Sequence, residues 1–296
     1  MSKEKQLVSV VMATFNEPVE MIEGAIGSIL NQTYQNIELL IFDDSTKPDT
    51  IASIDKIALS DARVSVHRFS ERKGFVESLN EGLKLAKGEY IARMDGDDFS
   101  LPERIKKEVD FLLDNPSIAV VGGQMDIMNE SGKVISHRSY PKGGVSLWLF
   151  SCIRNPLAHP TIMMRRELVD RGYRYNEKLK MSEDLDFWLR LLNDDYKVAN
   201  LEDTVLRFRV QDNFTDKRVS EIQRKYMANV RKANFRWAHP IHGVLSVASG
   251  WLFTHVSASS IKNLYDKEKW ERSYDHNENA FSGEFCRWRQ RYCIFL

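Results

Sequence analysis

Short apolar runs alternate with amphipathic segments through the first 115 residues of the chain. The runs are rich in β-branched or aromatic residues, as expected of strands buried on both faces, and cover Leu7–Met12, Ile37–Phe42, Val64–Val66 and Tyr90–Met94. Between them, apolar positions recur at helical spacing, which predicts helices from Pro18, around Ile51–Ala58, over Phe75–Ala86 and from Pro102 to before Pro116. This alternation predicts an α/β fold with a doubly wound, mostly parallel sheet.

The pattern changes after Ile118. Strand-like runs now follow one another, with a turn signal at Asn129–Gly132 and a helix that starts near Ser182. The runs are Ile118–Val121, Met125–Met128, Val134–His137, Thr161–Met164 and Val205–Val210. Closely spaced strands joined by turns favour antiparallel pairing. We therefore expect antiparallel strands to be added to the parallel sheet, and the α/β domain to cover residues 1–215.

The composition shifts from Lys217 onwards, and we expect residues 216–296 to form a helical C-terminal extension. Between positions 217 and 236 there are seven Lys or Arg residues and a single acidic residue, Glu221. Ile241–Ile261 then contains no Asp, Glu, Lys or Arg. The stretch has the length of a membrane span, about 20 residues, but its Ser, His and Gly residues favour a buried or interfacial helix. An interfacial helix beside basic residues would associate with an anionic membrane surface.

Charge and composition narrow the class of protein. Lys plus Arg (42) balance Asp plus Glu (42), which gives no support for a nucleic-acid-binding protein. A hydrophobic content of 43% and a charged content of 28% are typical of a soluble globular protein. The three cysteines lack metal-ligand spacing and the first residues lack a signal-peptide core. We therefore expect a cytoplasmic protein in a reducing compartment.

Acidic residues gather where two of the predicted strands end. Asp43 and Asp44 close the second run, and the segment Asp95–Asp98 closes the fourth. In an open parallel sheet, ligands bind outside the carboxyl ends of the strands. Carboxylates crowded there repel one another unless a cation compensates, and oxygen-rich sites suit Mg²⁺ or Mn²⁺, which hold substrate phosphates. The pattern predicts a metal-dependent enzyme that handles a nucleotide diphosphate.

Five segments share the order and spacing of motifs in a known family. They are Val8–Glu17 (VSVVMATFNE), Phe42–Ser45 (FDDS), Gly74–Asn80, Met94–Asp98 (MDGDD) and Ser182–Leu191 (SEDLDFWLRL). Between positions 7 and 215 the chain resembles the family 2 glycosyltransferases. The resemblance implies the GT-A fold, inversion at the anomeric carbon, a nucleotide-sugar donor, and Mn²⁺ or Mg²⁺ as the cofactor. One departure is Leu79, where family members often carry Arg.

The resemblance implies that the donor nucleotide contacts the loops after the first strands and the start of the third helix. The residues concerned are Ala13, Thr14, Phe15, Asn16, Glu17, Asp43, Asp44, Lys73, Gly74, Asn80, Asp95 and Gly96. Structural roles are the alternative for several of them. Asn16 could cap the helix at Pro18, and Asp43 could form an Asx turn with Ser45.

The resemblance also assigns a metal ligand and a catalytic base. Asp97 is the expected direct metal ligand, and Asp95 is expected to contact ribose, metal or metal-bound water. Asp184 is the expected general base that deprotonates the acceptor hydroxyl, and Glu183 is expected to position the acceptor. Acidic residues in a first helical turn also interact favourably with the helix dipole, which is the structural alternative.

His159 and Arg190 are further candidates for contact with the donor or the acceptor. Together these features predict an enzyme that moves a sugar from a UDP-sugar to a hydroxyl of a saccharide or of a polyprenyl-diphosphate-linked saccharide. The resemblance implies a role in bacterial O-antigen, capsule or exopolysaccharide synthesis, in the cytoplasm or on the cytoplasmic face of the inner membrane. A nucleotidyltransferase is an alternative, weakened because Ala13–Glu17 is not glycine-rich. A non-catalytic nucleotide-sugar-binding module is another.

Overall fold

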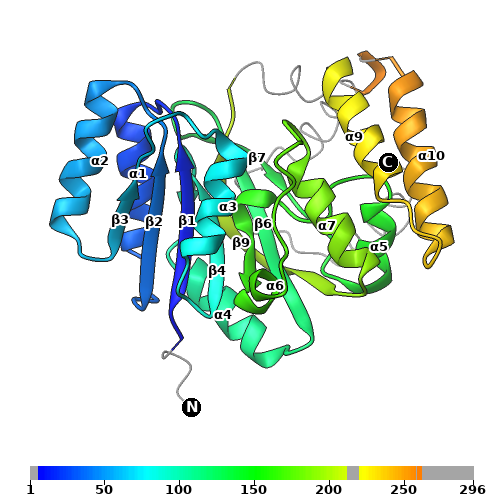
Figure 1. Cartoon of the computed structure of the whole chain (residues 1–296), viewed down its shortest axis with the longest axis horizontal. Helices are drawn as coiled ribbons and strands as arrows, with labels where there is room; N and C mark the ends of the chain where they lie inside the picture. Colours follow the sequence, from blue (N-terminus) through cyan, green and yellow to red (C-terminus); the bar gives the residue numbers. More distant parts are fainter. Residues whose placement is uncertain (1–5, 212–219, 258, 262–296) are drawn as a thin grey trace, which may run out of the picture.

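The computed structural model describes residues 6–211, 220–257 and 259–261 (Figure 1). Within these ranges a nine-stranded mixed sheet has the order β3-β2-β1-β4-β8-β6-β9-β5, with β7 paired to β6. Its first four strands are parallel, and they are β3 (Val64–His67), β2 (Ile37–Asp43), β1 (Val8–Thr14) and β4 (Tyr90–Asp95). Each of them coincides with a predicted apolar run.

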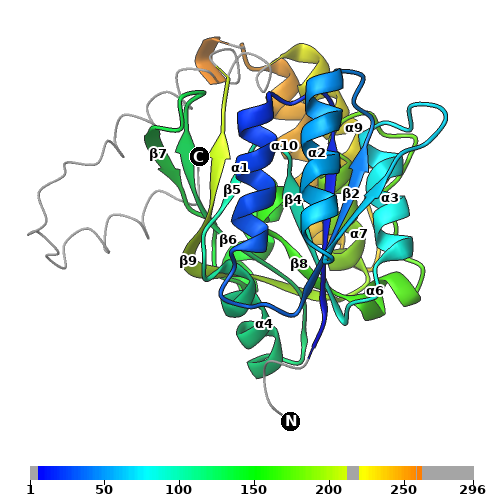
Figure 2. The ribbon, with the colours of Figure 1, turned by 90° about the vertical axis from the view of Figure 1, so that its left-hand side faces the viewer.

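Helices cover both faces of the parallel part of the sheet. α1 (Val19–Leu30) and α2 (Pro48–Ser60) pack on one face and lie side by side in Figure 2. α3 (Phe75–Leu85) packs on the opposite face. Successive side chains of a strand point to opposite faces, so Met12 of β1 joins the core under α1 while its neighbour Val11 joins the core under α3. The prediction of a doubly wound α/β sheet is confirmed.

Antiparallel strands extend the sheet beyond β4. β8 (Met163–Arg165) is antiparallel to both β4 and β6 (Ile118–Met128). β9 (Lys197–Arg209) runs parallel to β6, while β5 (Phe99–Ser100) and β7 (Val134–Arg138) are antiparallel to β9 and β6 respectively. The expected mixture of parallel and added antiparallel strands is confirmed.

The prediction of two separate strands at Ile118–Val121 and Met125–Met128 is wrong, because both runs belong to β6, which continues through Gly122 and Gly123. A Cβ atom on Gly122 would lie 2.7 Å from Asn200 Oδ1, and one on Gly123 would lie 2.5 Å from Val205 Cγ2. The apolar pattern is therefore interrupted by close approach of neighbouring segments, and the two glycines lie where the β6–β9 register shifts.

The strand predicted from Thr161 starts later than expected. His159–Thr161 form a 3-10 turn, β8 begins at Met163, and α6 (Arg166–Asp170) follows β8 directly. The helix predicted from Pro102 is α4 (Arg104–Asp114), which packs against β6.

The last described helices form one end of the molecule (Figure 1). α9 (Glu221–Ala233) and α10 (Pro240–His255) lie against each other, α9 contacts α7 (Glu183–Asn193), and α10 contacts α5 (Gly144–Ser151). Among the described residues, none of the helices has the length and apolar character needed to span a bilayer. The predicted domain boundary at residues 215–216 and the basic tail after residue 261 lie outside the described ranges.

Candidate active site

Parallel register brings three polar loops to the same edge of the sheet. Thr14 at the end of β1 is paired with Asp43 at the end of β2, and Ala13 is paired with Asp95 at the end of β4. The loops that follow these strands therefore lie side by side at the carboxyl edge, where ligands bind in open α/β sheets. The structure brings together the residues predicted from the strand ends.

The loop after β1 is fastened to the loop after β2. Asn16 has a left-handed backbone (φ 63°), and its side-chain oxygen accepts hydrogen bonds from the backbone N–H groups of Thr46 (2.8 Å) and Lys47 (2.9 Å). Asn16 therefore does not cap α1, whose N-cap position is Pro18. The alternative of a helix cap at Asn16 is wrong, because its side chain forms hydrogen bonds to the loop after β2 instead.

Glu17 forms hydrogen bonds within the loop after β1. Its carboxylate accepts hydrogen bonds from the Thr14 hydroxyl and from the Phe15 backbone N–H (2.8 Å). The Phe15 ring is 40% exposed, and the Arg72 guanidinium lies 3.7 Å from its centre. An exposed ring with a cation on its face at the ligand-binding edge of the sheet is suited to stacking on a planar group.

Asp43 and Asp44 have different partners. Asp43 is buried, forms an ion pair with Arg68 (2.7 Å), and accepts a hydrogen bond from the Ser45 backbone N–H (2.9 Å), which is the predicted Asx turn. Asp44 accepts from the backbone N–H groups of Gly74 (2.7 Å) and Lys73 (3.3 Å). Asp44 thus holds the start of α3 beside the loops, where Gly74 has a φ of 80°.

Carboxylates crowd the turn after β4. Burial raises the pKa of Asp97 to about 7, and the nearby charges of Asp95 and Glu17 add to this. Burial, Asp95 and Asp97 together hold the pKa of Asp98 well above its usual range, although its carboxylate accepts a hydrogen bond from the Arg209 backbone N–H (2.8 Å). The turn therefore carries more negative charge than its own donors stabilise.

The donor set at this turn fits a divalent cation held jointly with a ligand. Among the described residues, no group of three or more His, Cys, Asp or Glu side chains converges into a closed metal site. Mg²⁺ commonly uses one or two carboxylates and completes its shell with water and substrate phosphates. Asp97 and Asp95 supply such carboxylates, and burial together with the charges of Asp95 and Glu17 raises the pKa of Asp97, an effect that a bound cation would oppose.

A second acidic pair lies at the start of α7. Burial raises the pKa of Glu183 to about 7, and the charge of Asp184 adds to this. His159 Nδ1 lies 3.8 Å from Glu183 Oε1, and His159 Nε2 is 2.8 Å from the Tyr175 hydroxyl. Burial, with a smaller effect of Arg93, lowers the pKa of His159 well below its usual value, so its imidazole is neutral at pH 7. His159 therefore contacts the acidic pair without neutralising it.

Asn155 contacts the predicted base and was missed by the sequence analysis. Its side-chain N–H donates a hydrogen bond to Asp184 Oδ2, and the Leu185 backbone N–H donates to Asp184 Oδ1 (2.7 Å). The Asn155 side-chain oxygen is buried without a hydrogen-bond partner among the described residues. No periodicity or spacing links Asn155 to a residue 29 positions later, so the contact is visible only in the fold.

Arg93 is the second residue that sequence analysis missed. Its side chain is 7% exposed and forms an ion pair with Asp95, and its guanidinium lies 5.2 Å from the centre of the Phe75 ring. Its charge lowers the pKa values of both Asp97 and Glu183, so it lies close enough to both acidic groups to act on each. A signal existed, since alternate strand positions share a face and Arg93 stands two residues before Asp95 in an apolar run.

Two of the predicted site residues, Asn80 and Arg190, form hydrogen bonds to the segment that precedes α7. Asn80 donates to the Tyr175 backbone carbonyl (3.0 Å) and accepts from the Tyr175 N–H (2.9 Å). Arg190 forms an ion pair with Asp186 (2.8 Å) and donates to the Arg174 carbonyl (2.7 Å). These contacts fix the segment that leads into the acidic pair.

Comparison with known proteins agrees with this architecture. The family model for glycosyl transferase family 2 matches residues 9–173, more than half of the chain. The O-antigen biosynthesis glycosyltransferase WbnJ of Escherichia coli is 33% identical over 218 residues, which cover 71% of this chain and 82% of WbnJ.

Two solved structures share the fold. S. aureus TarS 1–349 in complex with UDP-GlcNAc has a TM-score of 0.65 and 18% identity, over 89% of this chain and 78% of that one. The mannosyltransferase PcManGT from Pyrobaculum calidifontis, in complex with GDP-Man and Mn²⁺, has a TM-score of 0.61 and 15% identity, over 90% and 84%. The fold is therefore the GT-A fold.

The chain belongs to the family 2 glycosyltransferases. It is related to enzymes of surface-polysaccharide biosynthesis.

Proposed function

We propose that the protein is a metal-dependent inverting glycosyltransferase that uses a UDP-sugar. The observation that carries the proposal is the presence of two acidic groups that are both influenced by the charge of Arg93, one at the end of β4 and one at the start of α7. The first group suits the departing diphosphate with its cation, and the second suits removal of a proton from an incoming hydroxyl. A nucleotidyltransferase has no evident use for the second group.

The donor occupies the loops at the carboxyl edge of the parallel strands. The loop Ala13–Glu17, with Asp43 and Asp44, receives the uridine, and the Phe15 ring with Arg72 above it offers a surface for the planar base. TarS supports this nucleotide, because its structures contain UDP and UDP-GlcNAc. Asp44 holds the start of α3 at this edge through the backbone N–H groups of Lys73 and Gly74, and this helix start is the proposed neighbour of the phosphates.

Asp97 is the proposed metal ligand, and Asp95 contacts the ribose, the metal or a water bound to it. When Mn²⁺ or Mg²⁺ is bound there, it neutralises the charge that develops on the departing diphosphate. PcManGT, with Mn²⁺ in its structure, supports the choice of a divalent cofactor. Gly96 lets Ile22 and Glu17 approach the turn closely, because a Cβ atom on it would lie 3.1 Å from Ile22 Cδ1 and 3.3 Å from the Glu17 carboxyl carbon.

Asp184 is the proposed general base. It accepts the proton of the acceptor hydroxyl, whose oxygen attacks the anomeric carbon from the face opposite the departing UDP. The hydrogen bond from Asn155 holds the carboxylate in one orientation. Glu183 and neutral His159 line the same position and are proposed to contact the acceptor. Asn80 and Arg190 are proposed to position the acidic pair, because they hold the segment that leads into α7.

The acceptor is proposed to be a saccharide or a polyprenyl-diphosphate-linked saccharide in O-antigen, capsule or exopolysaccharide synthesis. The relationship to WbnJ supports this class. A lipid-linked acceptor implies that the enzyme works in the cytoplasm at the inner-membrane surface.

The proposal is tested by UDP release from a panel of UDP-sugars with Mn²⁺ and Mg²⁺. Asp184→Asn should retain UDP affinity and lose at least about 100-fold in turnover, because a positioned base contributes 10²–10⁴-fold. Asp203→Asn is the matched control, since Asp203 is half exposed and pairs with Lys107 away from either acidic group. UDP-sugar binding without turnover in the wild type would instead identify a non-catalytic module, and pyrophosphate release would identify a nucleotidyltransferase.

A further inference from the structure

α10 is amphipathic in the reverse of the usual sense. Its exposed side chains are large and apolar, with exposed fractions of 69% for Ile241, 58% for Val244, 62% for Trp251 and 55% for Leu252. Its buried side chains are polar or small, and they are His242, Gly243, Ser246 and Gly250. A surface helix of a soluble protein normally turns its apolar stripe to the core. α10 turns that stripe away from the protein.

Specific contacts fix this orientation. His242 Nε2 lies 2.9 Å from the Ser151 hydroxyl, and Ser246 Oγ accepts a hydrogen bond from Arg231 (3.0 Å). A Cβ atom on Gly250 would lie 3.1 Å from Ala228 Cα, so the glycine allows α10 to approach α9 closely. Rotating α10 to bury its apolar stripe would break the polar contacts and leave the Arg231 charge buried without them.

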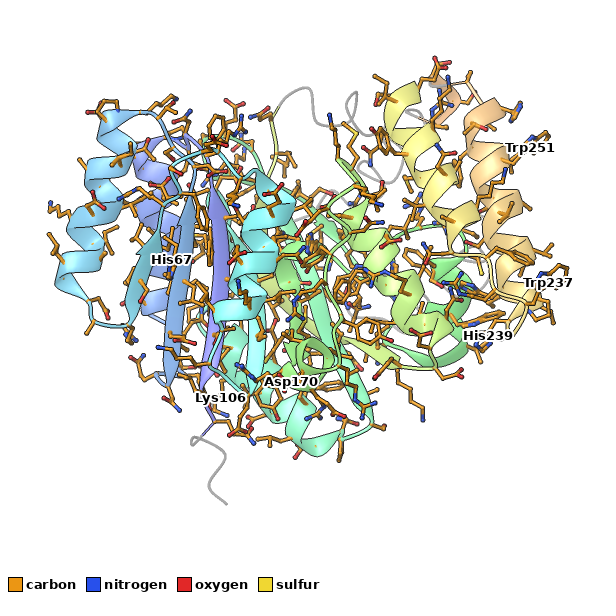
Figure 3. The ribbon with its side chains drawn as sticks, in the orientation of Figure 1. His67, Lys106, Asp170, Trp237, His239 and Trp251 are labelled. Carbon is orange, nitrogen blue, oxygen red and sulfur yellow. The ribbon has the colours of Figure 1, made fainter. Side chains whose placement is uncertain are left out.

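Two tryptophans mark the ends of the exposed stripe. Trp237 precedes α10 and is 83% exposed, and Trp251 lies in its last turns. Figure 3 shows both side chains projecting outward from the same side of the molecule. Indole rings favour the boundary between water and lipid, because an apolar ring and a polar N–H are both satisfied there.

The surroundings of the stripe are basic. Residues 220–257 contain five Lys or Arg and one Glu, a net charge of +3 with His neutral when the buried Arg231 is left out, whereas the whole chain has a net charge of zero. α10 itself has no acidic or basic residue other than His. Lys232 and Arg236 are exposed near the Trp237 end. An apolar stripe with basic neighbours matches an anionic lipid leaflet in both chemistry and charge.

We propose that the outer face of α10, formed by Trp237, Ile241, Val244, Leu245, Trp251 and Leu252, is a docking surface for an anionic lipid bilayer. The helix lies on the leaflet instead of crossing it, because it has 16 residues and carries buried polar groups on its other side. The docking surface is independent of the nucleotide site, and only its link to a lipid-linked acceptor rests on the proposed function.

The docking surface is linked through α9 to the helix that carries the proposed base. Gln223 of α9 donates to the Ser182 hydroxyl (3.2 Å), at the N-cap of α7. Asn234 donates to Asp186 Oδ1 (2.9 Å). α9 in turn packs along α10. A bilayer bound to α10 therefore has a fixed relation to Glu183 and Asp184, which suits delivery of an acceptor held in that bilayer.

The test is flotation of the full chain with vesicles, comparing phosphatidylcholine–phosphatidylglycerol mixtures with pure phosphatidylcholine. Leu245→Ser/Trp251→Ser should bind anionic vesicles at least about tenfold more weakly, since burial of each such side chain contributes about 1.5–3 kcal/mol. Leu59→Ser is the matched control, because Leu59 on α2 is 91% exposed and lies far from α10. Wild type and Leu59→Ser should float equally with anionic vesicles, and less as salt rises.

Other results overturn the docking surface. Wild type that binds neither vesicle, or a double variant that binds as well as wild type, shows that the outer face of α10 does not contact lipid. A concentration-dependent dimer that the double variant abolishes, without vesicle binding, assigns the face to a second copy of the chain. UDP release with a soluble acceptor should be the same in the double variant as in wild type, because the docking surface is separate from the nucleotide site. Wild type that floats with anionic vesicles but shows no turnover would refute only the proposed function.

Discussion

The crowded turn after β4 should make the metal-free protein less stable as the pH rises. Asp97 has a pKa of about 7 in the folded chain against 3.8 for an ordinary Asp. The folded state therefore holds this proton more tightly than the unfolded state, and stability falls as the pH rises from about 4 through about 7. At about 1.36 kcal/mol per pKa unit, the difference corresponds to about 4 kcal/mol.

Asp97→Asn isolates this contribution, because the amide is neutral in both states. Between about pH 5 and about pH 8, the free energy of unfolding of Asp97→Asn minus that of wild type should rise by up to about 3 kcal/mol. Glu183 also has a pKa of about 7, so it lowers the free energy of unfolding as the pH rises. This contribution is present in both wild type and Asp97→Asn and cancels in the difference. Urea unfolding in the presence of a chelator at both pH values measures the difference, and Asp203→Asn serves as the control.

Adding Mn²⁺ at about pH 8 should stabilise wild type more than Asp97→Asn, because a cation bound only to the folded state stabilises it by mass action. Wild-type stability that is independent of pH would refute the electrostatic reasoning. A variant less stable than wild type at about pH 8 would do the same, since it would show that the ionised carboxylate is well compensated by groups in the protein.

Three further predictions concern residues that the fold brings into contact. Asn155→Ala should lower kcat about 10- to 100-fold with little change in UDP affinity, because a hydrogen bond to a charged group contributes about 1.5–3 kcal/mol; an altered donor KM with normal kcat would contradict this. Arg93→Gln should tighten Mn²⁺ binding in the absence of donor, followed by electron paramagnetic resonance, because it removes a cation paired with Asp95. Gly123→Ala should lower stability by about 1–3 kcal/mol in urea unfolding, since its Cβ would overlap Val205.

The loops that meet at the carboxyl edge of the sheet could be predicted from the sequence alone. Each of β1, β2 and β4 is a short run buried on both faces, so its end is visible as the point where polar residues begin. In-register parallel pairing then requires those ends to meet, as Thr14 does with Asp43. The grouping of the β1, β2 and β4 loops follows from local pattern plus one rule of topology.

The contacts on the acceptor side could not be predicted in this way. Asp184 and Asn155 come from segments whose relative position depends on how α5, α7 and α9 pack, and no periodicity encodes that packing. The uninterrupted β6 was missed because Gly122 and Gly123 carry no apolar side chain, although their presence is required by neighbours in β9. Composition described α10 as uncharged, but which face is buried depends on partners in α5 and α9.

The raised pKa values of Asp97 and Glu183 have a common cause and a common consequence. Each carboxylate is buried beside another carboxylate, and Arg93 is the cation that acts on both. Such an arrangement destabilises the ligand-free fold near neutral pH, so it persists only where a ligand offsets it. In the proposed function, the cation that accompanies the donor diphosphate compensates the first group, and the proton of the acceptor hydroxyl compensates the second. The charge imbalance of the free protein is therefore the complement of its two proposed substrates.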